Sequence, residues 1–193
     1  MAANASQDAS MPDAEAQGAQ DRIDELLDRL KVAHRTGAGK DGLGARHRTF
    51  DYALSDMREG ELHNPWHFHV LPSINVHSAA FNPDKFYFEN FDEAAAYIQD
   101  PYLGAHLGYI LTVILEQTPA GVGVKALMGD RDDGVAQLHS CVTLVDWFMM
   151  NTDIETHDDV KTIPRQILAK YFNGEEKVHE QTALVCAAWG NGE

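Results

Sequence analysis

The chain has little cysteine. Its 193 residues include two cysteines, Cys141 and Cys186, which lie far apart in the sequence and form no C-x-x-C motif. A disulfide scaffold and a cysteine zinc site are therefore not indicated, and a reducing, cytoplasmic location is expected. Because each cysteine falls in phase with the apolar residues of a predicted helix, we expect both to be buried.

Positive charge is also scarce. Fifteen lysines and arginines stand against thirty aspartates and glutamates, which gives a formal net charge of −15. A chain with this balance repels nucleic-acid phosphates and gains nothing from counterion release. We therefore expect no nucleic-acid partner.

The chain also lacks an obvious membrane-spanning segment. The hydrophobic stretch 101–115 is closed by Glu116, and a transmembrane helix needs about 20 apolar residues. The N-terminus carries acids and lacks the basic and apolar regions of a secretory signal. We expect a soluble protein without membrane contact, in which residues 1–19 form a disordered tail because they offer little to bury.

What the chain does have is helical periodicity. Apolar residues recur at spacings of three and four in seven segments, which glycine, proline or capping residues separate. The predicted helices cover residues 21–33, 50 to about 60, 91–99, 101–116, about 130–149, 160–172 and 175–189. No persuasive alternation predicts strands. We therefore expect an all-α fold, with about seven helices in a single domain over residues 20–189 and with 101–116 as its most buried helix.

One segment interrupts this pattern. Residues 63–88 contain three prolines and several aromatic residues, which predicts an irregular loop. If the stretch around Trp66 is extended, alternation points Trp66, Phe68 and Val70 inward and leaves His67 and His69 partly solvated.

Histidines make a metal site one hypothesis for this loop. His63, His67 and His69, with His77 nearby, would supply nitrogen ligands to zinc or another divalent metal if the loop brought them to one point. The alternative is that these histidines are exposed, or held by core groups beside an aromatic plug. We favour the alternative and expect no cofactor.

Four segments carry a pattern beyond periodicity. They are YALSDMREGELHNPWHFHVLP, FDEAAAYIQDPYLGAHL, MGDRDDGVAQLHSCVTL and ILAKYFNGE, in this order between residues 48 and 185. Together they resemble the uncharacterised family DUF1810, which is sometimes labelled calpastatin-like. The resemblance implies an all-helical domain and no established activity. This chain departs from the family pattern at two positions, because Leu62 and Gln137 stand where relatives place lysines. If the family has a site for anions, that site would be lost or altered here.

Polar residues in these segments form a predicted ligand site. Buried polar groups persist only when they are bonded to one another or to a ligand. The predicted ligand-binding residues are Arg58, Trp66, Asp132, Asp133, Ser140 and Thr143. The alternative is a structural network in which Arg58 pairs with Asp132 or Asp133.

Three hypotheses for function follow. The first is a non-enzymatic module that binds a small polar ligand or a protein partner. The second is a hydrolase acting on a small, possibly nucleotide-like substrate, with His67 or His69 as base and Asp132 or Asp133 as a metal or cation ligand. The third is an adaptor subunit that docks through its acidic tail and first helix. An imidazole, an acid and Arg58 around one point would favour the enzyme, whereas groups bonded to one another would favour binding or structure.

Overall fold

A computed structural model gives the fold over most of the chain. It describes residues 11–37, 49–63, 65–74, 86–117, 123–129, 132–172 and 178–191, without the side chains of 11–13, 117, 132 and 133. The helices in these ranges are α1 (Met11–Thr36), α2 (Phe50–Glu59), α3 (His67–Val70), α4 (Phe91–Gln99), α5 (Leu103–Gln117), α6 (Val124–Met128), α7 (Asp132–Asn151), α8 (Asp158–Tyr171) and α9 (Glu180–Gly190). Two strands, β1 (Ser73–Ile74) and β2 (Tyr87–Phe88), pair in parallel with Ser73 opposite Tyr87.

The all-α prediction is confirmed. Each predicted helix has a counterpart, and the described residues add two short helices, α3 and α6, and the small sheet. No helix in the described ranges is both long and apolar enough to cross a membrane.

Helix α1 is longer than the sequence analysis predicted. It begins at Met11 rather than near Asp21, so residues 11–19 are helical and the prediction of a tail over them was wrong. The prediction considered only what these residues could bury. Alanine has the highest helix propensity of all residues, and this segment contains Ala14, Ala16 and Ala19. Adding residues to an existing helix is easier than starting a new one, so the segment continues the helix formed by the residues that follow. Residues 1–10 lie outside the described residues.

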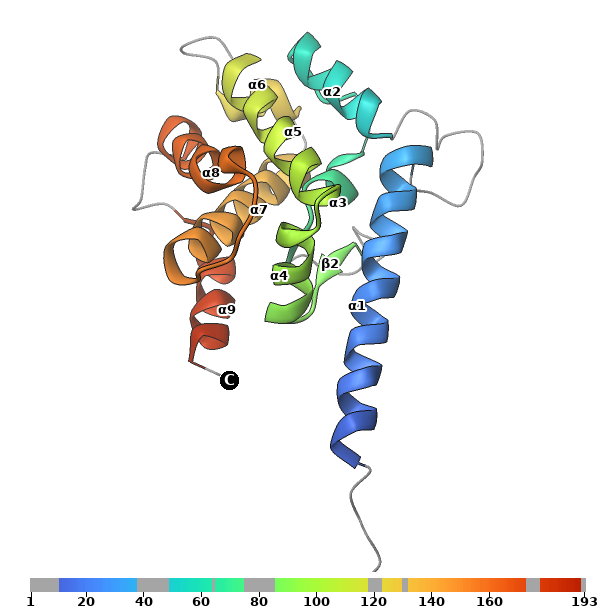
Figure 1. Cartoon of the computed structure of the whole chain (residues 1–193). Helices are drawn as coiled ribbons and strands as arrows, with labels where there is room; N and C mark the ends of the chain where they lie inside the picture. Colours follow the sequence, from blue (N-terminus) through green and yellow to red (C-terminus); the bar gives the residue numbers. More distant parts are fainter. Residues whose placement is uncertain are drawn as a thin grey trace, which may run out of the picture.

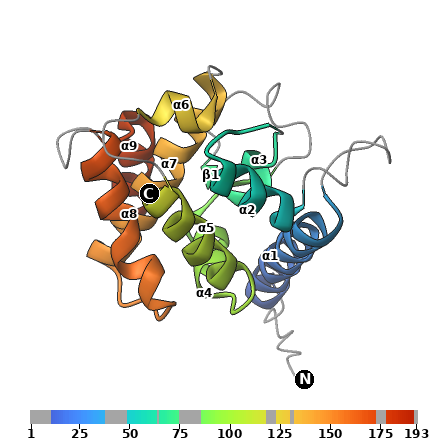
Figure 2. The same ribbon diagram turned by 90° about the horizontal axis from the view of Figure 1, so that it is seen from above.

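Helix α5 lies at the centre of the arrangement (Figure 1). It packs against α8, α2 and α4, while α7 packs against α8 and α9. Helix α1 contacts α4, α3 and α2, and its N-terminal half extends past the other helices (Figure 1). Seen from above, α1 to α3 lie on one side of α5 and α7 to α9 lie on the other (Figure 2).

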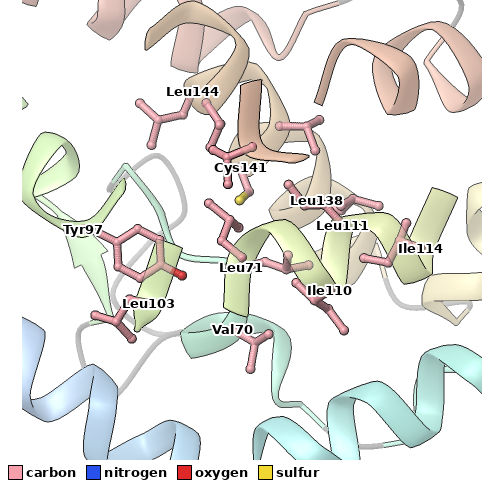
Figure 3. Close-up of a cluster of buried hydrophobic side chains, with 14 of the residues drawn as sticks. Val70, Leu71, Tyr97, Leu103, Ile110, Leu111, Ile114, Leu138, Cys141 and Leu144 are labelled. Atoms are coloured by element: carbon pink, nitrogen blue, oxygen red, sulfur yellow. The ribbon is translucent and has the colours of Figure 1, made fainter. Parts of the chain in front are cut away.

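The core is built around the apolar stripe of α5. Its fully buried residues are Leu103, Leu107, Ile110, Leu111 and Ile114. Figure 3 shows Ile110 and Leu111 of this stripe between Val70 of α3 and Cys141 of α7. Burying one such side chain stabilises a fold by roughly 1.5–3 kcal/mol. Cys141 and Cys186 are buried as predicted, and burial raises the pKa of each thiol to about 12.

Two glycines allow close packing against α5. A Cβ at Gly104 would lie 2.5 Å from the carbonyl oxygen of Ile98 in α4. A Cβ at Gly108 would lie 3.2 Å from Val160 Cγ2 in α8. Since the Gly104 distance is shorter than any real Cβ contact, a larger residue there would force α4 and α5 apart.

Capping residues position the helices around α5. Asn90 Oδ1 accepts the Glu93 N–H at 3.0 Å and caps α4. Asp100 Oδ1 accepts the Leu103 N–H at 3.0 Å at the start of α5, and Asp100 Oδ2 lies 2.6 Å from Lys31 Nζ of α1. Burial alone would raise the pKa of Asp100, but the Lys31 ammonium and the backbone donors hold it below its usual value. The Lys31–Asp100 pair thereby ties α1 to the first turn of α5.

The loop after α2 differs from the sequence prediction. Residues 67–70 form a helical turn, in which the Val70 N–H donates to the Trp66 carbonyl at 3.1 Å. Side chains in a helical turn point around the axis rather than to alternate sides. His67 and His69 are therefore buried, with exposed fractions of 0% and 1%, and the prediction that they are partly solvated was wrong.

Candidate functional site

Trp66, a predicted ligand-binding residue, is anchored to the protein itself. Its indole is fully buried, and its Nε1–H donates to Asp56 Oδ2 at 2.7 Å. The same oxygen accepts the backbone N–H of His63 at 3.1 Å. Asp56 thus ties the start of the loop to α2, and the indole donor of Trp66 is used in a structural contact.

Arg58, the predicted cation of the site, lies at the surface where α2 meets α5. Its Nη2 donates to the Tyr109 hydroxyl at 2.7 Å, and its guanidinium carbon lies 5.9 Å from the centroid of that ring. The side chains of Asp132 and Asp133 lie outside the described residues. A pairing of Arg58 with either aspartate therefore stays a prediction.

Ser140 and Thr143 are buried in α7, where they bond to residues at the start of α9. Ser140 Oγ lies 2.7 Å from Thr182 Oγ1, which lies 2.8 Å from His179 Nδ1. Thr143 Oγ1 accepts the backbone N–H of His179 at 3.0 Å. The described residues of the predicted site therefore bond to three different parts of the protein: Trp66 to α2, Arg58 to α5, and Ser140 and Thr143 to the start of α9.

The histidines of the loop do not converge on one point. His63 is exposed beside Asp56, with its Nδ1 3.3 Å from Asp56 Oδ1, whereas His67 and His69 are buried. His77 lies outside the described residues. In the part of the chain that the structure describes, no group of three potential metal ligands occurs.

Two other histidines form a hydrogen-bonded pair, which we call the histidine pair. His34 of α1 and His106 of α5 have their Nδ1 atoms 3.0 Å apart. Their rings meet edge to edge, with an interplanar angle of 9°. Phe50 of α2 stacks on His106 with centroids 3.8 Å apart. His34 is 2% exposed, while His106 is partly exposed, so the pair runs from the interior to the surface.

Hydrogen bonds determine which ring nitrogens of the pair carry protons. His34 Nε2 lies 3.0 Å from the backbone oxygen of His69, and a carbonyl can only accept, so His34 Nε2 carries a proton. A neutral His34 then has a lone pair on Nδ1, which accepts the proton on His106 Nδ1. His106 Nε2 is left with a lone pair, and among the described residues it has no hydrogen-bond partner.

Burial keeps both rings of the pair neutral. It lowers the pKa of His34 to about 3, and the bond to His69 opposes this shift only in part. Burial also lowers the pKa of His106, while the nearby Asp51 carboxylate acts in the opposite direction. At neutral pH, His106 Nε2 is thus an unprotonated acceptor with a fixed orientation.

Tyr102 and Asp51 lie near His106, and Arg35 lies near Tyr102. The Tyr102 ring is 4.1 Å from the His106 ring, between centroids. Burial raises the pKa of Tyr102, so its hydroxyl stays protonated, and the exposed Arg35 and Asp51 lie close enough to act on it with opposite signs. We call His106 with Tyr102, Asp51 and Arg35 the His106 site.

The sequence analysis missed this site although a signal was present. His34 lies four residues after Leu30, and His106 lies four residues before Ile110, so both histidines fall in phase with buried stripes. A histidine in an apolar stripe needs a polar partner. Which partner it has depends on the packing of α1 against α5, and the periodicity of one helix does not specify that packing.

Comparison with known proteins gives one family and one related structure. The family described as a protein of unknown function, DUF1810, matches residues 42–184. No curated protein matches the chain. The crystal structure of the conserved hypothetical protein Rv1873 from Mycobacterium tuberculosis is similar with a TM-score of 0.57 and 20% sequence identity, over 84% of this chain and 95% of that one. At this identity the likeness supports the fold alone. Because the family match spans more than half of the sequence, the chain belongs to the DUF1810 family.

Proposed function

We propose that this protein is a binding module for a small polar ligand, which it holds at the His106 site. One observation carries the proposal: the chain of hydrogen bonds from the His69 carbonyl through His34 to His106 ends in an unprotonated Nε2 at a partly exposed position. A ligand that donates an N–H or O–H group to this nitrogen completes the chain.

The cost of burying the histidine pair supports a role in binding. Burying a polar ring in the core costs desolvation free energy, and its hydrogen bonds compensate for this cost without a large net gain in stability. An apolar pair in the same positions of α1 and α5 would pack without that cost. The pair contributes a fixed acceptor, and an acceptor that needs no reorientation loses little entropy when it binds a donor.

The charges around His106 indicate which ligands fit. The net charge of −15 and the neighbouring Asp51 disfavour strongly anionic ligands. The rings of Phe50 and Tyr102 provide an apolar, flat boundary. The ligand class supported best is a small neutral or cationic molecule with a hydrogen-bond donor next to a flat apolar part.

Nuclear magnetic resonance on protein with labelled histidine rings tests the proposal. Small amides, ureas and amino-heteroaromatics are titrated in, and at least one is expected to shift the His106 ring signals saturably. In the His106→Asn variant binding is followed through the His34 ring signals, and it should be lost, because the asparagine amide can still donate to His34 Nδ1 but offers no acceptor in the place of Nε2. His139, which stacks on Phe172 at 3.9 Å, is the internal control and should not respond. Saturable binding that survives in His106→Asn, or no binding by any probe, would contradict the proposal.

The adaptor hypothesis has one supporting observation of its own. The N-terminal half of α1 extends past the other helices (Figure 1) and exposes the acids Asp21, Asp24 and Glu25. A basic protein partner fits such a surface. Reversing two of these acids to lysine should abolish capture of such a partner without changing the His106 ring signals, so the two hypotheses can be tested separately.

A further inference from the structure

The hydrolase hypothesis places the base at His67 or His69, and both residues are buried. A general base must reach the proton that it abstracts, be unprotonated at working pH and have a fixed ring orientation. His106 combines a partly exposed ring with an unprotonated Nε2 and a partner that holds its Nδ1–H. The Nδ1 edge of His106 faces the buried His34, so the opposite edge of the ring, which carries Nε2, is directed away from the core.

The group that orients His106 differs from the carboxylate that often orients a catalytic histidine. His34 is itself fixed, because its Nε2–H donates to the His69 carbonyl at 3.0 Å. With its pKa lowered to about 3 by burial, His34 does not take up a proton from His106. The positive charge formed when Nε2 accepts a proton therefore stays on His106, and His34 acts as a positioning residue.

The charged and titratable groups around His106 come from four helices. Helix α1 contributes His34, α2 contributes Asp51 and α5 contributes Tyr102. Behind this layer, His69 of α3 contacts His34, and Arg35 of α1 lies near Tyr102. Asp51 stabilises an imidazolium at His106. Arg35 and the protonated Tyr102 hydroxyl are the two groups that would stabilise negative charge on a substrate oxygen.

The nucleophile follows from what lies around the ring. The rings in contact with His106 belong to His34, Phe50 and Tyr102, and the hydrogen bond of His106 goes to His34 rather than to a serine, threonine or cysteine. Both cysteines are buried with raised pKa values. We therefore assign water as the nucleophile. A neutral substrate fits best, because Asp51 and the net charge repel phosphate esters.

We infer that the His106 site hydrolyses small neutral carboxylic esters, with His106 as general base toward water and His34 as its positioning residue. This inference rests on the binding proposed above. His106 Nε2 takes a proton from water while the water oxygen bonds to the ester carbonyl carbon, and the C=O electron pair moves onto the carbonyl oxygen. When that pair returns, the bond to the alkoxy oxygen breaks and His106 gives its proton to the leaving oxygen. The products are a carboxylic acid and an alcohol, and the imidazole is neutral again.

Hydrolysis of p-nitrophenyl acetate by the full chain tests this inference. General base catalysis contributes typically about 100-fold or more, so the rate should exceed that of free imidazole at equal concentration by at least this factor. The reaction should slow in D₂O, and His106→Asn should reduce kcat to the background while circular dichroism shows a folded protein. His139→Phe is the matched control and should keep full activity.

Two variants of His34 separate positioning from mere support of the fold. Glutamine presents an N–H for the His69 carbonyl and an oxygen for His106 Nδ1–H, so His34→Gln should retain most of the activity. His34→Leu offers neither group and should lower kcat about 10-fold with KM unchanged. Equal activity of the two variants at equal thermal stability would overturn the positioning role.

The outcomes distinguish this inference from the proposed binding. Saturable binding at His106 without hydrolysis above free imidazole overturns the inference and leaves the binding module intact. An acetylated His106 with a burst of nitrophenol also overturns it, because His106 would then be the nucleophile. Ring spectra that show the proton on His106 Nε2 instead of Nδ1 overturn it without any variant. Absence of both binding and hydrolysis in the wild-type protein overturns both proposals.

Discussion

The two sides of α5 carry buried hydrogen-bond chains made of similar groups, and the chains end differently. On the α7–α9 side, the chain runs from Ser140 through Thr182 to His179, whose backbone N–H returns to Thr143 of the same helix. On the α1–α3 side, the chain runs from the His69 carbonyl through the histidine pair and ends at the surface. The first arrangement holds two helices together, and the second also presents an acceptor to solvent. The position of the last polar atom in a hydrogen-bond chain, buried or exposed, therefore distinguishes a structural network from a candidate site better than the number of polar residues does.

The largest expected effect is acid destabilisation through His34. Its pKa is about 6.5 in the unfolded chain and about 3 in the folded protein, so the unfolded state binds the proton more tightly. The stability linked to neutral His34 is fully present above pH 6.5 and is lost as the pH falls toward 3. The loss is at most about 1.4 kcal/mol per pH unit, or roughly 5 kcal/mol over the whole window.

Urea unfolding between pH 7.5 and pH 4 measures this loss. His34→Gln cannot be protonated, so its free energy of unfolding should fall less steeply than that of the wild type. The His139→Phe variant controls for removing an imidazole from the other side of α5. If wild type and His34→Gln have parallel pH profiles, the folded-state pKa of His34 is not depressed, and the histidine pair is not the acid-sensitive part of the fold.

The next effect concerns Trp66, which the sequence analysis placed in the ligand site. Trp66→Phe removes the donor to Asp56 and leaves a buried carboxylate with one bond fewer. Hydrogen bonds to charged groups contribute about 1.5–3 kcal/mol, and a loss of this size is expected in urea unfolding at pH 7. Trp189→Phe, at a partly exposed position, should cost less. Ligand binding at His106 should not change, and a loss of binding in folded Trp66→Phe would return Trp66 to the site.

The sequence predicted the fold well because each helix carries its own information. The apolar stripe of α5 is a local pattern, and its residues are buried as predicted. The caps at Asn90 and Asp100 are local patterns as well. The site was harder to predict, because the histidine pair joins residues 34 and 106, which only tertiary packing brings together. The buried His67 and His69 were misplaced for a related reason, since an extended stretch was assumed where packing selects a helical turn.

A smaller effect on stability is expected from the hydrogen-bond chain that links α7 to α9. Thr182 is the middle residue of this chain, so Thr182→Val removes one hydrogen bond from the Ser140 hydroxyl and one from His179 Nδ1. We expect a loss of about 1–2 kcal/mol in the free energy of unfolding, because a buried hydroxyl is left without an acceptor. Ser140→Ala should cost less, since Thr182 can still donate to His179. Ester hydrolysis and His106 binding should be unchanged in both variants, and a change in either would mean that the two sides of α5 are coupled.

The smallest effect on stability is expected from Asp51, at the surface of the His106 site. Its substitution is also the most specific test of the difference between the two hydrogen-bond chains. Asp51 is exposed, so Asp51→Asn should change the free energy of unfolding by no more than about 0.5 kcal/mol. Its carboxylate favours the imidazolium form, so its loss should lower the pKa of His106 further, as followed by ring signals during a pH titration. Glu59→Gln, at the other end of α2, is the matched control and should leave that titration unchanged. If Asp51→Asn also leaves the pKa of His106 unchanged, the Asp51 carboxylate does not act on the exposed end of this hydrogen-bond chain. The electrostatic difference proposed here between the His106 site and the buried network of α7 and α9 would then be absent.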